Sequence, residues 1–238
     1  MDLNGKTALV TGASKGIGRA VAEALAGVGM NVALTARDPA PLEALVTRLG
    51  SAGGGRALAL ACDVRDLEAQ REAVRRTIDA FGGLDLLVAN AGVGGRWSIE
   101  DLDPDTWQRI LDTNLTGVFH SVKASLDALI ASRGMIVTIG SLAGTNFFAG
   151  GAAYNASKFG LLGFSQAIML DLRDRGVRVA TIMPGSVATG FGGREVSDAD
   201  AWKIQPEDIA ETVLYLARMN PRTLPSRIEV RPARTSLD

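Results

Sequence analysis

Short runs of apolar residues alternate along this chain with longer stretches in which apolar residues recur every three or four positions. The short runs are rich in leucine and β-branched residues, a composition typical of buried strands. Several are apolar continuously rather than at every second position, as expected of strands covered on both faces. We therefore predict strands at 7–10, 32–35, 57–61, 84–89, 135–140, 177–183 and 226–230.

The longer stretches predict helices between these strands. Prolines 39 and 206 mark helix starts, and glycines 29, 50, 82 and 176 mark helix ends. Helices are expected over 16–28, 39–50, 66–81, 105–131 (with a break), 151–174 and 206–218. This alternation predicts a single α/β domain over 1–238, with a doubly wound (Rossmann) parallel sheet of about seven strands and helices on both faces.

Composition and charge are those of an ordinary globular protein. Hydrophobic residues make up 47% and charged residues 21% of the chain. The net charge of -1 gives no global field to attract nucleic acid or an anionic membrane, so neither partner is expected. The single cysteine, Cys62, excludes an internal disulfide and suits a reducing compartment. With no signal-like N-terminus and no apolar run of membrane-spanning length, the sequence predicts a cytoplasmic protein.

The segment TGASKGIG, residues 11 to 18, follows the first predicted strand and leads into the first helix. Glycines at 12, 16 and 18 permit a tight turn and let backbone N–H groups approach a pyrophosphate at the helix N-terminus. The spacing is G-x-x-x-G-x-G instead of G-x-G-x-x-G, so an ordinary glycine turn is the alternative. The position inside a βαβ unit favours a dinucleotide-binding loop.

The end of the second strand indicates which dinucleotide binds. In NAD sites an acidic residue there accepts a hydrogen bond from the ribose 2′-hydroxyl, whereas this chain has Ala36 followed by Arg37. Arg37 and Lys15 of the glycine loop would favour a 2′-phosphate, and hence NADP(H) over NAD(H). Asp38 is one residue further on and suits a helix cap before Pro39. The alternative is that both cations are solvated surface charges.

A phenol and an ammonium group lie four residues apart in YNASK, residues 154 to 158. On a helix this spacing puts Tyr154 and Lys158 on one face, about one turn apart. Because a neighbouring cation favours phenolate, we expect Lys158 to lower the Tyr154 pKa from about 10 towards a range useful for proton transfer. Taken alone, the two residues are also compatible with a surface pair on an amphipathic helix.

These features resemble the short-chain dehydrogenase/reductase family over nearly the whole chain. CDV (62–64), NAG (90–92) and PG (184–185) match the family's cofactor segments, and its four catalytic positions are matched by Asn114, Ser141, Tyr154 and Lys158. The resemblance implies hydride transfer between NADP(H) and a small carbonyl or alcohol substrate. The cofactor contacts that it implies are Gly12, Ser14, Lys15, Gly16, Ile17, Gly18, Arg37, Asp63, Val64, Asn90, Ala91, Gly92, Tyr154, Lys158, Pro184, Gly185, Val187 and Thr189.

The resemblance also implies a role for each catalytic residue. Tyr154 would be the general acid in ketone reduction and the general base in alcohol oxidation. Lys158 would hydrogen-bond the nicotinamide ribose, and Ser141 would hold the substrate oxygen and stabilise negative charge on it. Asn114, in the long helix, would hold a water that links Lys158 to solvent, and Asp63 would meet the adenine.

The sequence is least informative about the substrate. The family's variable lid corresponds to about 190–205, where glycines favour mobility. Arg194 is its one candidate for binding a carboxylate, and aromatic candidates for the pocket are Trp97, Phe147, Phe148, Phe191 and Trp202. A small, partly apolar ketone or aldehyde is favoured, with a 3-oxoacyl thioester as the alternative. Two other classes are weighed: a methyltransferase, which has no use for the Tyr-Lys pair, and a non-catalytic cofactor-sensing regulator, which would have lost the catalytic residues.

Other polar residues are interpreted as structural, and no metal site is expected. His120, the only histidine, is assigned to the core or an interface. Asp101, Asp103 and Asp105 precede a helix and predict turns and caps. The arginines of the tail are too sparse for a nucleic-acid patch and are expected to be solvated: Arg222, Arg227, Arg231 and Arg234.

Two predicted helices carry more apolar residues than one sheet-facing stripe needs. Gly160 and Gly163 interrupt the second of them at a cost of ~1 kcal/mol each, which suggests that another helix approaches closely. The family pairs through the corresponding helices, so a homodimer is expected, with a homotetramer as the alternative. The apolar residues concerned are Val118, Phe119, Val122, Leu161, Leu162, Phe164, Ile168 and Leu172.

Overall fold

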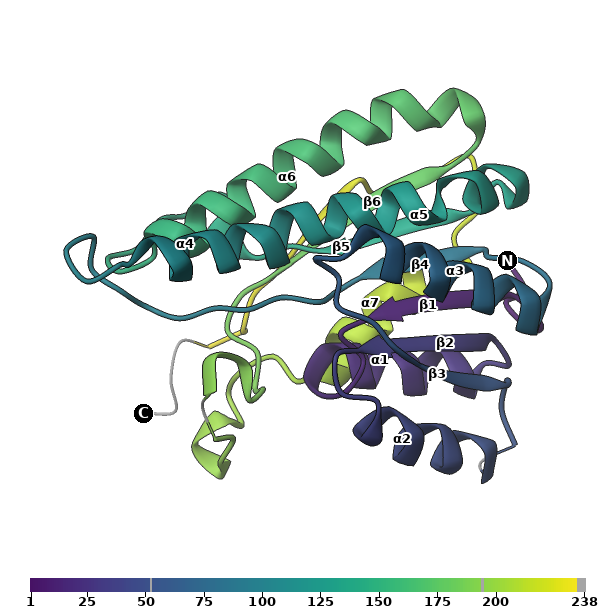
Figure 1. The fold of residues 1–238 in the computed structure, drawn as a ribbon. Helices are drawn as coiled ribbons and strands as arrows, with labels where there is room; N and C mark the ends of the chain where they lie inside the picture. The colour runs from purple at the N-terminus through teal and green to yellow at the C-terminus, as the bar shows by residue number, and fades with distance from the viewer. Residues whose placement is uncertain (52, 194, 235–238) are drawn as a thin grey trace.

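A computed structural model describes residues 1–51, 53–193 and 195–234 (Figure 1). Over these residues the chain alternates between strands and helices, as the sequence predicts. The strands are β1 (Thr7–Thr11), β2 (Asn31–Ala36), β3 (Ala57–Ala61), β4 (Leu86–Ala89), β5 (Met135–Ile139), β6 (Arg178–Pro184) and β7 (Arg227–Val230). The helices are α1 (Gly16–Gly27), α2 (Ala40–Ser51), α3 (Leu67–Phe81), α4 (Pro104–Leu111), α5 (Gly117–Ser132), α6 (Ala152–Leu172) and α7 (Pro206–Arg218).

The strands form one parallel seven-stranded sheet in the order β3-β2-β1-β4-β5-β6-β7. The chain builds outwards from β1 to β3, returns to pair β4 with β1, and then builds outwards again to β7. Strand order therefore reverses between β1 and β4, and ligands of open α/β sheets bind at the carboxyl ends of the strands at such a point.

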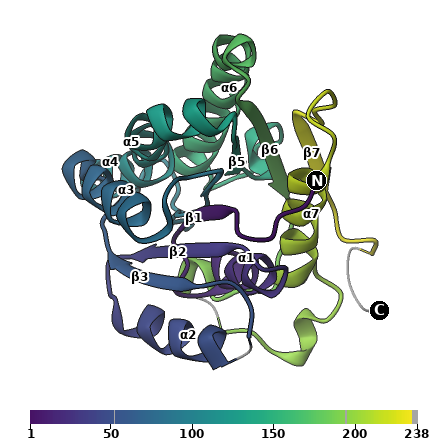
Figure 2. The ribbon, with the colours of Figure 1, turned by 90° about the vertical axis from the view of Figure 1, so that its right-hand side faces the viewer.

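Helices cover both faces of the sheet, which explains why the strands are continuously apolar (Figures 1 and 2). Ala8 and Val10 of β1 pack in a core shared with α1, α2 and α7. Leu9, between them, packs in the core on the other face, with residues of α3, α5 and α6. Strand β1 thus buries alternate side chains in two different cores.

The predicted break in the 105–131 stretch is a π-helical turn, Asp112–Thr116, between α4 and α5. A π turn inserts one extra residue into a helix and is frequent at functional sites. Asn114 lies in this turn, within the helical stretch where we expected it, because helical dihedral angles continue from α4 through the turn into α5. Gly50 is also not the helix end that we predicted, because α2 continues to Ser51.

The capping interpretations of the aspartates are confirmed where hydrogen bonds are present. Asp103 is the N-cap of α4 and accepts from the Thr106 N–H at 2.8 Å. Asp38 accepts from the Ala40 N–H at 3.0 Å, at the start of α2. These bonds satisfy N–H groups that have no partner inside the helix. Within the described parts of the chain, no helix combines the length and apolarity needed to cross a membrane.

Candidate active site

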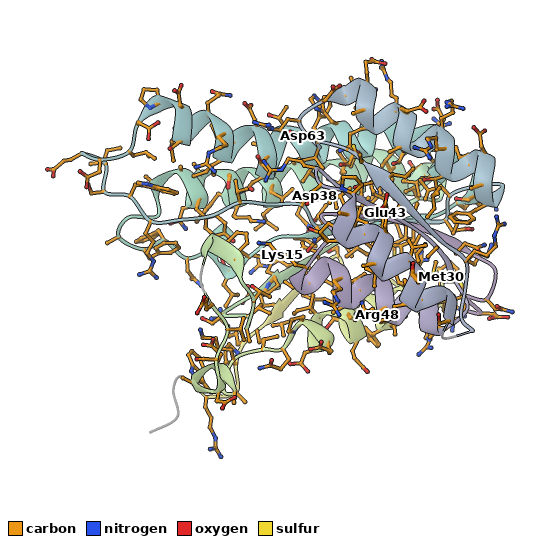
Figure 3. All side chains as sticks on the ribbon, turned by 60° about the horizontal axis from the view of Figure 1, so that its bottom comes forward. Lys15, Met30, Asp38, Glu43, Arg48 and Asp63 are labelled. Atoms are coloured by element: carbon orange, nitrogen blue, oxygen red, sulfur yellow. The ribbon has the colours of Figure 1, made fainter. Side chains whose placement is uncertain are left out.

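A cavity of about 1020 Å³ lies at the carboxyl ends of the strands. Every strand of the sheet is followed, within two residues, by a residue that lines it: Gly12, Arg37, Cys62, Asn90, Gly140, Gly185 and Arg231. In Figure 3, Lys15, Asp38 and Asp63, which follow β1, β2 and β3, lie in a row near this edge, away from Met30 at the other end of β2. The volume is at the upper end for small-molecule sites and suits an elongated ligand.

The glycine loop after β1 is held in place by the segment after β4. Asn90 donates from Nδ2 to the carbonyls of Thr11 and Gly12, at 2.9 and 3.1 Å. The Thr11 hydroxyl accepts from the N–H groups of Asn90 and Ala91. A Cβ on Gly18 would lie 2.4 Å from the Gly12 carbonyl oxygen and 2.5 Å from the Asn90 amide. The two motifs therefore form one unit that only glycine at 18 permits.

This unit fits the pyrophosphate of a dinucleotide. Gly12 has φ of 66°, and a Cβ there would lie 2.8 Å from Ala91 Cα, so this position requires glycine. Without a side chain at Gly12, the backbone of the loop is accessible to a ligand. Helix α1 begins at Gly16, which lines the cavity, so an anion can meet the helix N-terminus. All predicted cofactor contacts line the cavity except Gly18. Gly18 instead packs under the loop, a correction to its predicted role as a contact.

The far end of the cavity carries the residues predicted to select the cofactor. Lys15, Ala36 and Arg37 all line it, and Asp38 is engaged at the start of α2. Asp63 is held by Arg65, with Nη2 and Oδ2 2.6 Å apart. This hydrogen bond holds the pKa of Asp63 below its ordinary value, with Arg37 contributing a smaller effect in the same direction. Cations therefore surround a carboxylate that stays ionised at neutral pH.

Three predicted catalytic residues meet at the middle of the cavity. Tyr154 and Lys158 project from α6, and Ser141 follows β5 at the start of a short 3₁₀ turn. Tyr154 is a close neighbour of Ser141, whose hydroxyl accepts a hydrogen bond from the Ala143 N–H at 3.1 Å. Lys158 is buried and donates to the Ile139 carbonyl at 2.9 Å. The tyrosine, the serine and the lysine are thus fixed by α6 and by the end of β5.

The expectation that Lys158 lowers the Tyr154 pKa is not met. Burial raises the pKa of Tyr154 above its ordinary value, and the hydrogen bond from Ser141 opposes this only in part. Burial also lowers the pKa of Lys158 to about 8. The Lys158 Nζ points to the Ile139 carbonyl and lies 5.8 Å from the centre of the Tyr154 ring. Desolvation therefore outweighs the attraction between the two groups.

Asn114 lies outside the cavity lining and holds the loop after β4. Its Oδ1 accepts from the Val93 N–H at 2.8 Å, and its Nδ2 donates to the Val93 carbonyl at 2.9 Å and to the Ser157 hydroxyl at 3.0 Å. The side chain is fully buried. It therefore ties β4's loop, the π turn and helix α6 together behind Tyr154 and Lys158.

Asn155 is a positioning residue that sequence reasoning missed. Its Nδ2 donates to the carbonyls of Ala143 and Asn146, both at 2.8 Å. These bonds hold the loop that begins at Ser141 against α6. The sequence signal was the presence of two further polar residues, Asn155 and Ser157, between Tyr154 and Lys158, and both side chains are buried.

Aromatic residues line the substrate end of the cavity. Phe191, at the start of the predicted lid, lies with its ring centre 5.9 Å from that of Tyr154. A Cβ on Gly94 would lie 2.3 Å from the Phe191 ring, so the ring packs directly against the Gly94 backbone. Phe147, Phe148 and Trp202 also line the cavity. The base of the lid is fastened, because the Ala188 N–H donates to the Ile204 carbonyl at 2.9 Å.

One expectation about this end is wrong, one is incomplete, and one is outside the described residues. Trp97 does not line the cavity. Its ring packs over Gly95, and its backbone N–H donates to the Gly150 carbonyl. Arg231 and Arg234 of the tail are exposed, as expected, but both also line the cavity, which the sequence did not indicate. Arg194, the carboxylate-binding candidate of the lid, lies outside the described residues.

Sequence comparison links this site to known proteins. Residues 6–200 match the family model for short chain dehydrogenases. The chain is 40% identical over 227 residues to 3-oxoacyl-(acyl-carrier-protein) reductase FabG of Vibrio cholerae serotype O1, with 91% of each chain aligned. It is also 36% identical to glycine betaine reductase ATRR of Emericella nidulans, but it spans only 19% of the length of that protein.

Structure comparison gives the same result. An alcohol dehydrogenase of Thermococcus sibiricus, complexed with 5-hydroxy-NADP, superposes with a TM-score of 0.92 at 29% identity, covering 98% of this chain and 99% of the other. A metagenomic short-chain oxidoreductase in complex with NADP has a TM-score of 0.86 at 37% identity, covering 99% and 100%. A 3-ketoacyl-(acyl-carrier-protein) reductase of Brucella melitensis, complexed with NADH, has a TM-score of 0.89 at 26% identity, covering 98% and 99%.

The family model covers most of the chain, and the FabG relative aligns along nearly all of it. The fold, the glycine loop locked by Asn90 and the cavity at the strand ends agree with that match. The chain belongs to the short-chain dehydrogenase/reductase family of Rossmann-fold oxidoreductases.

Proposed function

We propose that this protein is an NADP(H)-dependent carbonyl reductase in which Tyr154 gives the proton to the substrate oxygen. The observation that carries the proposal is that Tyr154, Ser141 and Lys158 line the same cavity as the glycine loop. Oxidation of NADPH by a panel of small ketones and aldehydes tests it. Turnover of at least one of them is expected, and a chain that binds NADPH but reduces none would overturn the proposal.

Each side chain of the site has one task in this mechanism. When bound, the nicotinamide of NADP(H) supplies or accepts a hydride. Ser141 donates a hydrogen bond to the substrate oxygen and so stabilises the negative charge that develops there. Tyr154 protonates that oxygen. Lys158, fixed by the Ile139 carbonyl, holds the ribose next to the nicotinamide and supplies positive charge near the phenol.

Tyr154 holds its proton near neutral pH. A phenol with a pKa above its ordinary value is fully protonated near neutral pH, and a general acid must begin protonated. Phe191 covers the ring and limits its contact with water. The side chain is therefore in the form that a proton donor needs, and it acts as the base when the reaction runs in the other direction.

The cofactor preference follows from Lys15 and Arg37 at the end of β2. Two charge-assisted hydrogen bonds to a 2′-phosphate, at ~1.5–3 kcal/mol each, would favour NADPH over NADH by at least about tenfold. NADP complexes among the structural neighbours support this preference, while the NADH complex of the Brucella enzyme shows that the fold also accepts NADH. We expect Arg37→Asp to narrow or reverse the ratio of the two dissociation constants, measured by fluorescence titration.

A matched control separates this effect from a change in net charge. Arg76 is an exposed arginine of α3 outside the cavity, so Arg76→Asp changes the charge equally and should leave the ratio of dissociation constants unchanged. Equal affinities of the unmodified protein for NADPH and NADH would contradict the assignment.

A second candidate activity is reduction of a 3-oxoacyl thioester. The observation that favours it is the 40% identity to FabG over 91% of each chain. The cavity beyond Tyr154, lined by Phe147, Phe148 and Phe191, offers apolar surface for an acyl chain. A 3-oxoacyl thioester and a simple methyl ketone of the same chain length distinguish the two candidates by their kcat/KM values.

We also propose that the protein forms a homodimer through α5 and α6. Val118, Val122 and Leu161 face the core, and Gly160 is explained within the chain by Leu115, 3.0 Å from where its Cβ would be. Gly163, however, meets nothing within 4 Å. Large apolar side chains on these two helices stay partly exposed: Phe119, Phe159, Phe164 and Leu170. A second copy that pairs the same faces about a two-fold axis would bury this surface.

Sedimentation at micromolar concentration tests the dimer. Phe119→Glu should shift the protein towards monomer, because a charge would be buried at the centre of the interface. Ile99→Glu, at a well-exposed position in the loop before α4, should leave the sedimentation coefficient unchanged. A monomeric parent protein would show that the exposed faces have another purpose.

A further inference from the structure

The walls of the cavity carry far more positive than negative charge. Within the described residues, the cations that line it are Lys15, Arg37, Arg65, Arg96, Arg109, Lys158, Lys203, Arg231 and Arg234. Asp63 is the one carboxylate among the lining residues. The whole chain has a net charge of only -1, so positive charge is concentrated at this site. A cavity of one sign raises the local concentration of ligands of the opposite sign.

The proposed cofactor accounts for only part of this charge. Lys15 and Arg37 lie at the end of β2, where the 2′-phosphate is expected, and Arg65 is paired with Asp63 there. The pyrophosphate is assigned to the backbone of the glycine loop and the start of α1. Lys203 is paired with Asp200 at 2.6 Å. Among the described residues, Arg96, Arg109 and Arg234 also line the cavity, with neither a carboxylate in ion-pair distance nor a part of the cofactor assigned to them.

Arg231 and Arg234 reach the catalytic end of the cavity because of how β7 pairs with β6. Gly185 donates from its N–H to the Val230 carbonyl at 2.8 Å, which fixes the chain after β7. A Cβ on Gly185 would lie 3.1 Å from the Leu142 side chain and 3.2 Å from Pro232. Pro232 is therefore next to the turn that Ser141 begins, and the two arginines flank it in the sequence.

Arg96 lies on the loop between β4 and α4. Its guanidinium lies 5.0 Å from the centre of the Phe148 ring, which also lines the cavity. Phe148 belongs to the loop that Asn155 fastens to α6, since its N–H donates to Asn155 Oδ1 at 3.4 Å. Stacking on an aromatic ring orients a guanidinium and leaves its N–H edge free to bind an anion.

The ion pairs of these arginines leave positive charge in excess. Arg231 shares Glu229 with Arg227, so two guanidinium groups are matched by one carboxylate. In the part of the chain that the structure describes, no carboxylate lies within ion-pair distance of Arg96 or Arg234. Guanidinium groups that line a cavity without a carboxylate partner are available to a charged ligand.

We propose that the carbonyl substrate carries an anionic group, a carboxylate or a phosphate, which Arg96, Arg231 and Arg234 bind at the catalytic end of the cavity. This inference rests on the proposed carbonyl reductase activity and narrows its substrate class. The anionic group lies away from the carbonyl, so these arginines position the substrate while Ser141 and Tyr154 act on its oxygen. Carboxylate and phosphate groups both accept two parallel hydrogen bonds from a guanidinium group, so these arginines suit either anion.

Matched pairs of ketones test the proposal and distinguish the two anions. One pair is a 3-oxo acid and its ethyl ester, and the other is hydroxyacetone and hydroxyacetone phosphate. For at least one pair we expect the anionic member to have a KM at least about tenfold lower, as expected for one charge-assisted hydrogen bond, and this advantage to shrink as salt is added. The pair that shows the larger advantage identifies the anion.

Arginine variants test which side chains bind the anion. Arg96→Gln and Arg234→Gln should each reduce the ratio of kcat/KM between the anionic and the neutral ketone by about tenfold. Arg222→Gln, at an exposed position outside the cavity, should leave that ratio unchanged. Thermal unfolding of each variant checks that the fold is retained.

The outcomes separate this inference from the function on which it rests. Reduction of neutral ketones with no advantage for either anion overturns the inference and leaves the proposed reductase standing. An advantage that survives in both Arg96→Gln and Arg234→Gln also overturns it, since the anion must then bind elsewhere. Failure to reduce any ketone overturns the reductase and the inference together.

Discussion

Tyr154→Phe is expected to lower kcat by about 10²–10⁴-fold while the dissociation constant of NADPH stays within about twofold of the parent value. The substitution removes the hydroxyl next to Ser141 and leaves the aromatic ring, which packs against Phe191. The proton that the substrate oxygen needs then has no donor in place. Steady-state rates and a fluorescence titration with NADPH measure the two quantities.

The chain offers a matched control for this substitution. Its second tyrosine, Tyr215, lies exposed on α7, so Tyr215→Phe removes a hydroxyl from the surface and should leave kcat unchanged. A Tyr154→Phe variant that keeps a large fraction of the parent activity would show that the proton comes from another group.

Lys158→Met is expected to abolish activity and yet to stabilise the fold near neutral pH. Burial lowers the pKa of Lys158 from 10.5 to about 8, so folding disfavours its charged form. The unfolded chain therefore binds more protons between about pH 8 and pH 10.5, and the parent protein gains stability as the pH rises through that window. Below about pH 8 the full cost is present. Lys158→Met removes this cost of burying a charged lysine but also loses the hydrogen bond to the Ile139 carbonyl. The net effect should be a rise in the free energy of unfolding of about 1–3 kcal/mol.

Urea unfolding at several pH values measures this effect. The advantage of Lys158→Met over the parent should be largest below about pH 8 and should shrink towards pH 10.5. Lys123→Met, at an exposed position on α5, is the control and should change stability little at any of these pH values. A Lys158→Met variant less stable than the parent near neutral pH would show that burial does not disfavour the charged lysine.

Most of the fold was predictable because local sequence patterns determine its strands and helices. Continuous apolar runs such as that of β1 predict strands buried on both faces, and the structure divides Ala8, Leu9 and Val10 between two cores. Gly82 and Gly176 end their helices in the left-handed conformation that glycine favours. Gly50 was misleading because nothing in the local sequence distinguishes a glycine in the last turn of a helix from one just after it.

The candidate site was predictable only where function depends on a motif. The glycine loop and the Tyr154–Lys158 pair lie where the sequence indicated, but the pKa of Tyr154 depends on how deeply the ring is buried, and burial is a tertiary property. The positions of Arg231 and Arg234 depend on the pairing of β7 with β6, which brings a tail of ordinary composition next to Ser141. Trp97 was misassigned for the same reason, since its packing over Gly95 is set by the path of the loop.

We propose that this chain transfers hydride from NADPH to a carbonyl carbon while Tyr154 protonates the oxygen. The most direct test is to supply NADPH carrying deuterium at the transferable position and to analyse the alcohol product by mass spectrometry. We expect each alcohol molecule to gain one deuterium on the former carbonyl carbon, and Tyr154→Phe to form almost no product. Alcohol without deuterium, or no alcohol from any ketone tested, would contradict it.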